Sequence, residues 1–170
     1  MRGFIKRHRA AVISVGTLGT GLIVFVLVWF QPQKLFIEKT VNEGLPAATV
    51  QPTTSPSAAT EIRSGAFRSL EHRTTGRARL LRLVDGSLVL RLEGLDTSNG
   101  PDLRVYLSEL PSDKGWHAYG VRYLDVGALK GNRGSQNYRV AAGTDPARFH
   151  SAVIWCRRFK VGFGVAPLPH

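Results

Sequence analysis

The stretch Ser151-Ala-Val-Ile-Trp-Cys156, near the C-terminus, decides the fold class of this chain of 170 residues. Its residues are small, β-branched or aromatic, and β-branched and aromatic side chains favour strands. Because apolar residues occupy both faces, the stretch is predicted to be a strand buried on both sides, and therefore central in a sheet. On such a strand Ile154 and Cys156 share one face, while Val153 and Trp155 share the other.

The residues before this strand alternate short apolar runs with turn residues from Ile62 onward. About eight short strands with Gly, Pro, Asn and Asp between them predict an all-β domain. We expect an antiparallel β-sandwich or barrel-like domain over residues 62–168, and the sequence does not distinguish the two. The first strand is predicted over 65–70, and another follows the turn Asn99-Gly-Pro-Asp102 over 103–108.

A hairpin is predicted around Asp85-Gly86, a pair that favours a two-residue type I′ turn. In its second arm the leucines at 88, 90 and 92 should be buried, and Val89, Arg91 and Glu93 should face water. The first arm is less regular, because the adjacent Leu80-Leu81 would point to opposite faces, which a bulge could resolve. Farther along, Thr144 or Asp145 is expected to cap a short helical turn at Pro146.

The N-terminal third of the chain has a different composition. Residues 1–9 form a basic tail, and residues 10–30 contain no charge. About 20 apolar residues are enough for one transmembrane α-helix, although a cleaved signal and a buried helix stay open as alternatives. The charge asymmetry predicts a single-pass protein of the cell membrane, with a cytoplasmic N-terminus and an extracytoplasmic C-terminal domain. Residues 31–61, rich in Pro, Thr and Ser, are expected to be a disordered stalk.

The formal net charge of +11 does not indicate nucleic-acid binding. The basic residues are interspersed with acids, and no basic stripe alternates with exposed aromatic residues. We therefore expect no nucleic-acid partner. Paired carboxylates, a nucleophile elbow and a phosphate-binding glycine loop are also missing from the sequence, so a non-enzymatic role is favoured.

Residues 63–168 resemble a DM13 domain, also described as an electron-transfer DM13 domain. The resemblance is carried by Gly65-Ala-Phe67, His72 and Gly76, by Asn99-Gly-Pro-Asp-Leu-Arg-Val-Tyr-Leu-Ser108, by Leu129-Lys-Gly131 with Gly134, Gln136 and Tyr138, and by Val153-Ile-Trp-Cys156 with Phe159, Val161, Phe163, Gly164, Ala166 and Leu168. It implies a compact β domain, often extracytoplasmic and tethered to a membrane. It also implies a redox role centred on Cys156.

Three interpretations of Cys156, the only cysteine, are open. It is a small buried side chain in a central strand, a redox thiol activated by nearby cations, or half of an intermolecular disulfide. The corresponding functions are a redox or electron-transfer module with a redox protein partner, and a non-catalytic ligand- or protein-binding or structural module at the cell surface.

Candidate binding residues lie on this strand and in two loops. They are Trp155, the turn residues Gly100, Pro101 and Asp102, and the loop residues Trp116 and Tyr119. Core packing is the alternative for the aromatic residues, and fixing the turn by bonding its own backbone is the alternative for Asp102. His72, His117 and His150 lack metal-ligand spacing, no haem motif is present, and the sequence identifies no cofactor.

Overall fold

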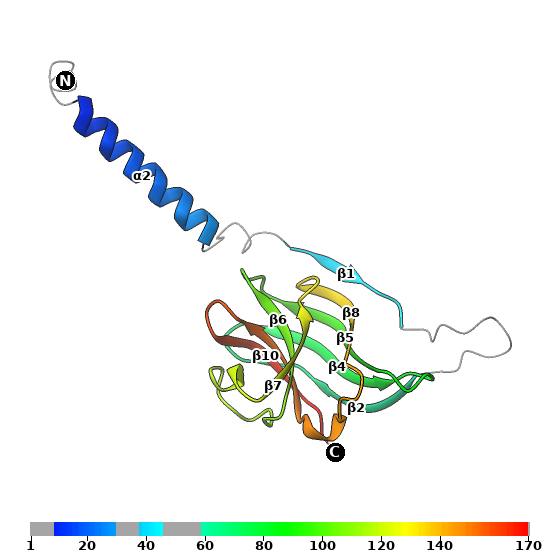
Figure 1. Ribbon diagram of the computed structural model, residues 1–170. Helices are drawn as coiled ribbons and strands as arrows, with labels where there is room; N and C mark the ends of the chain where they lie inside the picture. The colour runs from blue at the N-terminus through cyan, green and yellow to red at the C-terminus, as the bar shows by residue number, and fades with distance from the viewer. Residues whose placement is uncertain (1–8, 30–37, 46–58, 170) are drawn as a thin grey trace.

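The computed structural model describes residues 9–29, 38–45 and 59–169 (Figure 1). In this part of the chain one α-helix precedes ten strands and two short 3-10 helices. The elements are α2 (Arg9–Trp29), β1 (Thr40–Asn42), β2 (Thr60–Ala66), β3 (Arg68–Ser69), β4 (Thr74–Arg82), β5 (Leu88–Thr97), β6 (Leu103–Ser108), η2 (Ala118–Gly120), β7 (Tyr123–Ala128), β8 (Arg133–Arg139), η3 (Pro146–Arg148), β9 (Ser151–Cys156) and β10 (Val161–Pro167). The prediction of a mostly β domain after one helix is confirmed.

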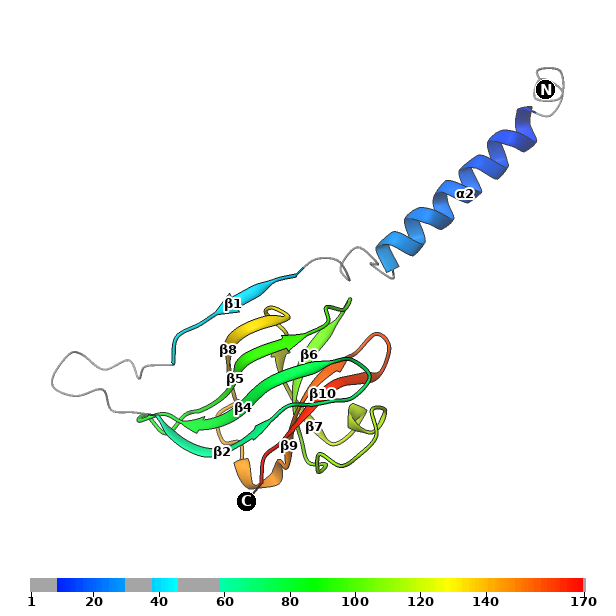
Figure 2. The same cartoon turned by 180° about the vertical axis from the view of Figure 1, so that it is seen from behind.

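The strands form two five-stranded sheets that share one hydrophobic core (Figures 1 and 2). The first sheet has the order β1-β8-β5-β4-β2, and the second has the order β3-β10-β9-β6-β7. All pairings are antiparallel except that of β1 with β8. The core contains side chains from both sheets, such as Leu90 of β5 and Ile154 of β9, which is the arrangement of a two-layer sandwich.

Strand β9 is the middle strand of the second sheet, and all six of its residues are buried. Its inner face places Ala152, Ile154 and Cys156 in the shared core. Its outer face places Val153 and Trp155 in a second, smaller cluster. The predicted central position and the predicted division of its faces are therefore both confirmed.

The first predicted strand, over residues 65–70, is in fact two strands that belong to different sheets. Strand β2 pairs with β4 in the first sheet, and β3 pairs with β10 in the second. The chain changes sheets at Phe67, whose amide donates to the Gly76 carbonyl and whose side chain is buried in the core. The alternation of apolar and polar residues does not reveal this change of sheet, because the apolar Phe67 fits the alternation in either sheet.

The hairpin of β4 and β5 forms where it was expected, but its turn is not of type I′. That turn needs positive φ at both central residues, and here Gly86 has φ 79° while Asp85 is not among the residues with positive φ. The Leu83 amide donates to the Ser87 carbonyl, and the Gly86 amide donates to the Leu83 carbonyl, so three residues form the loop. The Asp85 carboxylate accepts a hydrogen bond from the Ser87 amide, and this bond stabilises the loop.

The irregularity considered at Leu80-Leu81 lies on the β2 side of β4. There the register shifts between Glu61 and Arg63, which pair with Leu81 and Leu80. On the β5 side Leu80 and Leu81 stay in register with Leu90 and Val89, and both are buried. The register of β4 with β5 shifts at Gly76, which has φ 111°, a conformation that favours glycine.

The face of β5 that was expected in water is covered. Val89 and Arg91 are buried, with Arg91 only 6% exposed. The Arg91 guanidinium donates to the carbonyls of Glu43 and Gly44 at 3.1 Å each. Residues 38–45, expected in the stalk, thus lie on the first sheet, with β1 along the edge of β8. The other stalk residues, except 59–61, lie outside the described residues.

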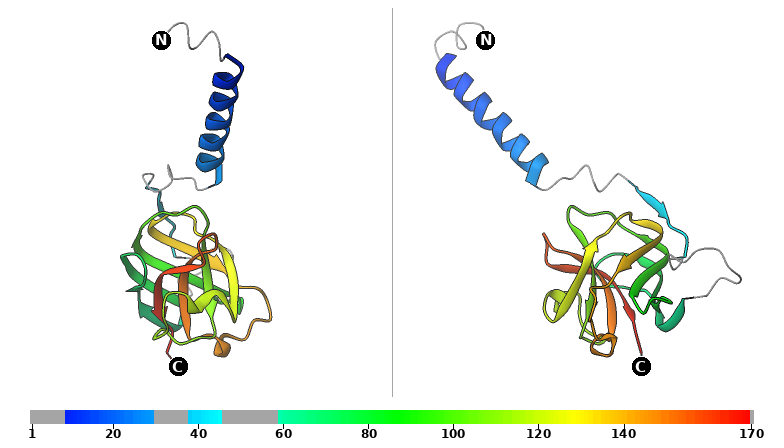
Figure 3. Two further views of the ribbon diagram at one scale, coloured as in Figure 1. Left: turned by 90° about the vertical axis from the view of Figure 1, so that its left-hand side faces the viewer. Right: turned by 45° about the vertical axis from the view of Figure 1, so that its right-hand side comes forward.

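The predicted helix over residues 10–30 is present as α2, which lies apart from the strands in every view (Figure 3). Within the described ranges we find no helix with the length and apolarity needed to cross a membrane. The basic tail, apart from Arg9, lies outside the described residues.

Candidate functional site

Cys156 lies at the end of β9 with its side chain fully buried in the shared core. Its backbone pairs with Leu103 of β6 on one side and with Val161 of β10 on the other. A thiol needs solvent access to act as a nucleophile, so this sulfur can meet a soluble partner only if the end of β9 opens. The following residue, Arg157, points its guanidinium to Asp102, with Nε donating to Oδ2 at 2.9 Å. Asp102, rather than the thiol, is therefore the partner of this cation.

The outer face of the second sheet carries three aromatic rings that lead from the interior to solvent, one each from β9, β6 and β7. The Trp155 and Tyr106 ring centroids are 6.2 Å apart, and Tyr106 stacks on Tyr123 at 3.9 Å with an interplanar angle of 8°. Trp155 is 4% exposed and Tyr106 1%, whereas Tyr123 is 41% exposed. We call Trp155, Tyr106 and Tyr123 the ring chain.

The two phenols of the ring chain differ in their surroundings. Burial raises the pKa of Tyr106 well above its ordinary value, and its side-chain hydrogen bond with Tyr123 and the nearby Asp125 carboxylate raise it further. Asp125 is held by Arg104, whose Nη2 lies 2.9 Å from Oδ2. The Tyr106 phenol is therefore protonated at neutral pH and shares a proton-donating contact with a phenol at the surface.

The loop after β6 closes over Trp155. Within it, Tyr119 is fully buried in the same cluster as Trp155, and its hydroxyl donates to the carbonyls of Pro111 and Lys114. A Cβ on Gly120 would lie 2.9 Å from Cζ2 of Trp155, so this position allows the close approach of the loop. Of the two aromatic residues considered for a contact surface, Tyr119 is therefore core, and Trp116 is exposed.

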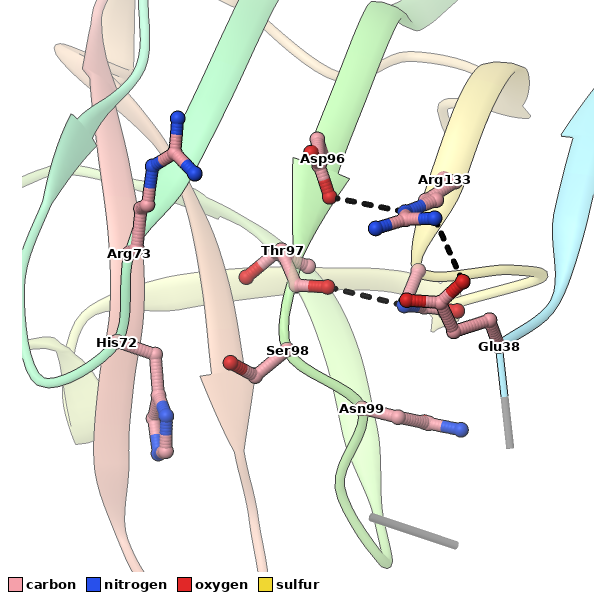
Figure 4. Close-up of a pocket in the computed structure, with 9 residues that line it drawn as sticks. Glu38, His72, Arg73, Asp96, Thr97, Ser98, Asn99 and Arg133 are labelled. Atoms are coloured by element: carbon pink, nitrogen blue, oxygen red, sulfur yellow. Dashed lines mark hydrogen bonds and ion pairs between the residues drawn. The ribbon is translucent and has the colours of Figure 1, made fainter. Parts of the chain in front are cut away.

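A polar hollow of about 340 Å³ lies at one end of the two sheets, where four segments meet (Figure 4). Arg133 forms one wall, bridging Asp96 at 3.2 Å and Glu38 at 2.6 Å. His72 and Arg73 come from the opposite side. The hollow is lined by Glu38, His72, Arg73, Asp96, Thr97, Ser98, Asn99, Asn132 and Arg133.

The two residues opposite Arg133 have different environments. The His72 ring lies 3.8 Å from the ring of Phe163, a core residue, and burial lowers the pKa of His72. Arg73 is exposed, and within the described part of the chain its guanidinium has no ion pair. The hollow thus offers a neutral imidazole, a cation and the hydroxyl of Ser98 to a ligand.

The predicted binding residues Gly100, Pro101 and Asp102 line an adjoining hollow of about 470 Å³. It shares Asn99 and Asn132 with the polar hollow. The turn is held by Asn99, whose Oδ1 accepts from the Gly100 amide at 2.8 Å. Asp102, expected to bond its own backbone, instead binds Arg157 through both its carboxylate and its carbonyl.

The sequence-predicted residues therefore fall into separate places. Gly100, Pro101 and Asp102 line the hollow at the end of the sheets, and Cys156 lies in the core. Trp155 lies on the outer face, and Trp116 is exposed in the loop after β6. Tyr106, Tyr123, Arg73 and Ser98 were missed as site residues. Only the pairing of β6 with β9, in which Tyr106 lies opposite Val153, could have shown that Tyr106 shares a face with Trp155.

No group of three or more His, Cys, Asp or Glu residues that could hold a metal ion occurs within residues 9–29, 38–45 and 59–169. Comparison with curated proteins and with solved structures finds no match. A family model described as electron transfer DM13 matches residues 66–168, which is more than half of the chain and includes the ring chain, Cys156 and both sides of the polar hollow. The chain therefore belongs to the electron transfer DM13 family.

Proposed function

We propose that this chain is a redox module of the DM13 type in which oxidising equivalents move along the ring chain. The observation that carries the proposal is the continuous contact of Trp155, Tyr106 and Tyr123 from the interior to solvent. The family description supports an electron-transfer role. Tyrosine and tryptophan rings are the side chains of this site that can lose one electron without an exposed thiol or a metal ion.

The first step begins at the surface. A one-electron oxidant in solution or on a redox partner protein takes an electron from Tyr123, and the phenolic proton passes to water. Tyr106 then gives Tyr123 an electron and its phenolic proton across the contact of the two stacked residues, which restores the Tyr123 phenol. Trp155 in turn reduces Tyr106, giving up its indole proton as Tyr106 takes one back.

Cys156 is the deepest donor in this proposal. It follows Trp155 directly, and its thiol can give one electron to the oxidised indole through the backbone between them. The thiol proton passes to water and water returns a proton to the indole nitrogen, so this last step needs the end of β9 to open, because Cys156 is fully buried. This role keeps the thiol as the redox centre that the family resemblance implies, with the rings as its route to the surface.

The test uses the full chain with Trp29→Phe and Trp116→Phe, which leaves Trp155 as its one tryptophan. A photogenerated ruthenium(III) polypyridyl complex serves as the oxidant, and transient absorption follows the tyrosyl and indolyl radicals. We expect a tyrosyl radical that decays as an indolyl radical forms. Tyr106→Leu should lengthen the tyrosyl lifetime and abolish the indolyl signal, and Cys156→Ser should lengthen the indolyl lifetime.

Tyr138→Phe is the matched control, because Tyr138 is a buried tyrosine of the first sheet and lies outside the ring chain. It should change none of the radical lifetimes. If Tyr106→Leu leaves the indolyl radical yield unchanged, the rings are core packing and the proposal fails.

A second candidate function is the binding of a small anionic ligand in the polar hollow. It is favoured by Arg73, an exposed cation opposite a wall whose carboxylates are already paired with Arg133. Titration with citrate, followed by amide NMR, should shift Ser98 and His72 in a saturable manner, and Arg73→Ala should abolish the shift. Arg139→Ala, at an exposed arginine on β8, is the control. Absence of saturation with the parent chain would exclude this candidate.

We also propose that the helix α2 attaches the domain to the cell membrane, with residues 1–9 in the cytoplasm and the β domain outside. The support is the charge-free segment 10–30 after four basic residues and the exposed apolar side chains from Leu22 to Val28. The chain should stay with membranes after alkaline carbonate washing, and added protease should reach the β domain in cells with a permeable outer surface. Release by carbonate would contradict attachment through α2.

A further inference from the structure

Residues 38–45, the docked segment, are not part of the region that matches the DM13 model. Their strand β1 is the parallel edge of the first sheet, next to β8. The following strand, β2, forms the opposite edge, with β8, β5 and β4 between the two. The docked segment therefore adds to the domain as a separate peptide would, instead of through a hairpin.

The edge of β8 binds the backbone of the docked segment in register. The Lys39 amide donates to Oδ1 of the buried Asn132 at 2.7 Å. The Arg133 amide donates to the Lys39 carbonyl at 3.2 Å, and the Glu43 amide donates to the Ser135 carbonyl at 2.8 Å. These hydrogen bonds recognise an extended backbone, as in other cases in which a peptide adds a strand to a sheet edge.

The end of the docked segment is recognised by its acidic side chain and its carbonyls. The Glu43 carboxylate accepts from Nζ of Lys130 at 2.7 Å and from the Asn137 amide at 2.8 Å. The hydrogen bond with Lys130 lowers the pKa of Glu43, against an opposing effect of burial. The buried Arg91 donates to the carbonyls of Glu43 and Gly44. It also binds Glu93 and Asn137, so the docked segment supplies part of the compensation for its desolvation.

Two glycines shape the surface that receives the segment. A Cβ on Gly131 would overlap the Lys39 carbonyl, and a Cβ on Gly134 would overlap the Val41 carbonyl. Gly134 also has φ 95°, which disfavours other residues. The edge of β8 thus has the shape, the donors and the buried cation of a site for an extended segment with a glutamate near its end.

The connection to β2 does not fix which molecule supplies the segment. Residues 46–58 can span at most about 47 Å when extended, and the four strand spacings across the sheet amount to only about 19 Å. A segment from another molecule would make the same contacts, so the two arrangements differ only in the effective concentration of the segment. Exchange of an identical element is a low-cost route to dimers.

We infer that the edge of β8, with Arg91 and Lys130, is a docking site for the segment 38–45 of a second copy of this chain, giving strand-exchanged dimers. In a single molecule the chain's own segment fills the site. An empty site would leave an unpaired sheet edge and a buried arginine without its carbonyls, so exchange proceeds between two filled forms.

The test uses two versions of the full chain, both with Cys156→Ser and each with a different tag. One carries Asn42→Cys and the other carries Ser135→Cys, two positions that are Cα partners across β1 and β8. After co-expression and mild oxidation, we expect a disulfide-linked species that carries both tags. Its fraction should increase with protein concentration and fall several-fold when Glu43→Lys is added.

Two controls make the result decisive. A single chain with both cysteines must form an internal disulfide, and failure to do so would overturn the docking itself. A mixture of Asn42→Cys with Val84→Cys, at an exposed position of the turn between β4 and β5, must give no linked species. The inference is wrong if the internal disulfide forms completely and the co-expressed Asn42→Cys and Ser135→Cys chains yield no species with both tags. In that case the segment docks only within its own chain.

Discussion

The two faces of β9 differ in what surrounds them, although their residues alternate along one short strand. The inner face places Ile154 and Cys156 in a closed core between the two sheets. The outer face places Trp155 in a small aromatic cluster, which Tyr123 connects to solvent. Adjacent residues of one strand can therefore differ in their connection to solvent, and the redox-capable thiol is on the closed side.

The largest expected effect is the loss of packing on the inner face. Ile154→Ala should lower the free energy of unfolding by about 2–5 kcal/mol, because Ile154 is fully buried between two sheets that cannot move together freely. Urea unfolding of the full chain, followed by circular dichroism, measures the change.

Val153→Ala is the matched substitution on the outer face, since Val153 is equally buried. It removes fewer carbon atoms, and the covering loop over the outer face can settle into the space, so the loss should be clearly smaller. Equal losses at the two positions would show that the faces do not differ in rigidity.

The second prediction concerns the access of Cys156. In the native chain the thiol should resist a maleimide reagent at neutral pH and should react promptly in denaturant, because its side chain is fully buried. Cys156→Ser should destabilise the fold by about 1–3 kcal/mol, the cost of burying a hydroxyl without a partner. Val84→Cys in the turn between β4 and β5, at a position that is 52% exposed, gives the reference rate of labelling in a Cys156→Ser chain. A native Cys156 that reacts at the reference rate would contradict the closed inner face.

The strands that alternate or are wholly apolar could be predicted from the sequence. β6 has the predicted bounds, and β9 has the predicted central position and faces, because local patterns of apolar residues determine both. The same patterns gave the hairpin of β4 and β5 at Gly86. Its three-residue loop depends on backbone angles that the pair Asp85-Gly86 allows but does not require.

The features that depend on contacts between distant residues could not be predicted. Arg91 has the polarity of a surface residue, and its burial depends on partners that are distant in the sequence, the carbonyls of Glu43 and Gly44 and the side chain of Asn137. The contact of Tyr106 with Tyr123 depends on the register of β6 with β7, which no local pattern encodes. The polar hollow is likewise lined by residues from separate segments of the chain, the first at Glu38 and the last at Arg133.

The third prediction tests how closely the outer face is packed. Gly120→Ala should destabilise the fold by about 1 kcal/mol and change the fluorescence of Trp155, because the new Cβ lies 2.9 Å from the indole ring. Gly115→Ala in the same loop is the control, since a Cβ there meets nothing within 4 Å. If the two variants behave alike, the loop does not pack tightly on Trp155, and the outer face is looser than the ring contacts indicate.

The smallest expected effect is a pH dependence at the end of the inner core, where His72 lies on Phe163. Burial lowers the pKa of His72 in the folded chain, so the unfolded chain binds the proton at a higher pH. The contribution of His72 is therefore complete above about pH 6.5, the ordinary pKa of histidine, and is lost as the pH falls from there through the folded pKa. His72→Gln should remove this part of the pH dependence of unfolding, whereas His117→Gln, at an exposed position, should leave it unchanged. A parent chain whose stability is flat between pH 7 and 5, relative to His72→Gln, would mean that His72 is hydrated and does not close this end of the core.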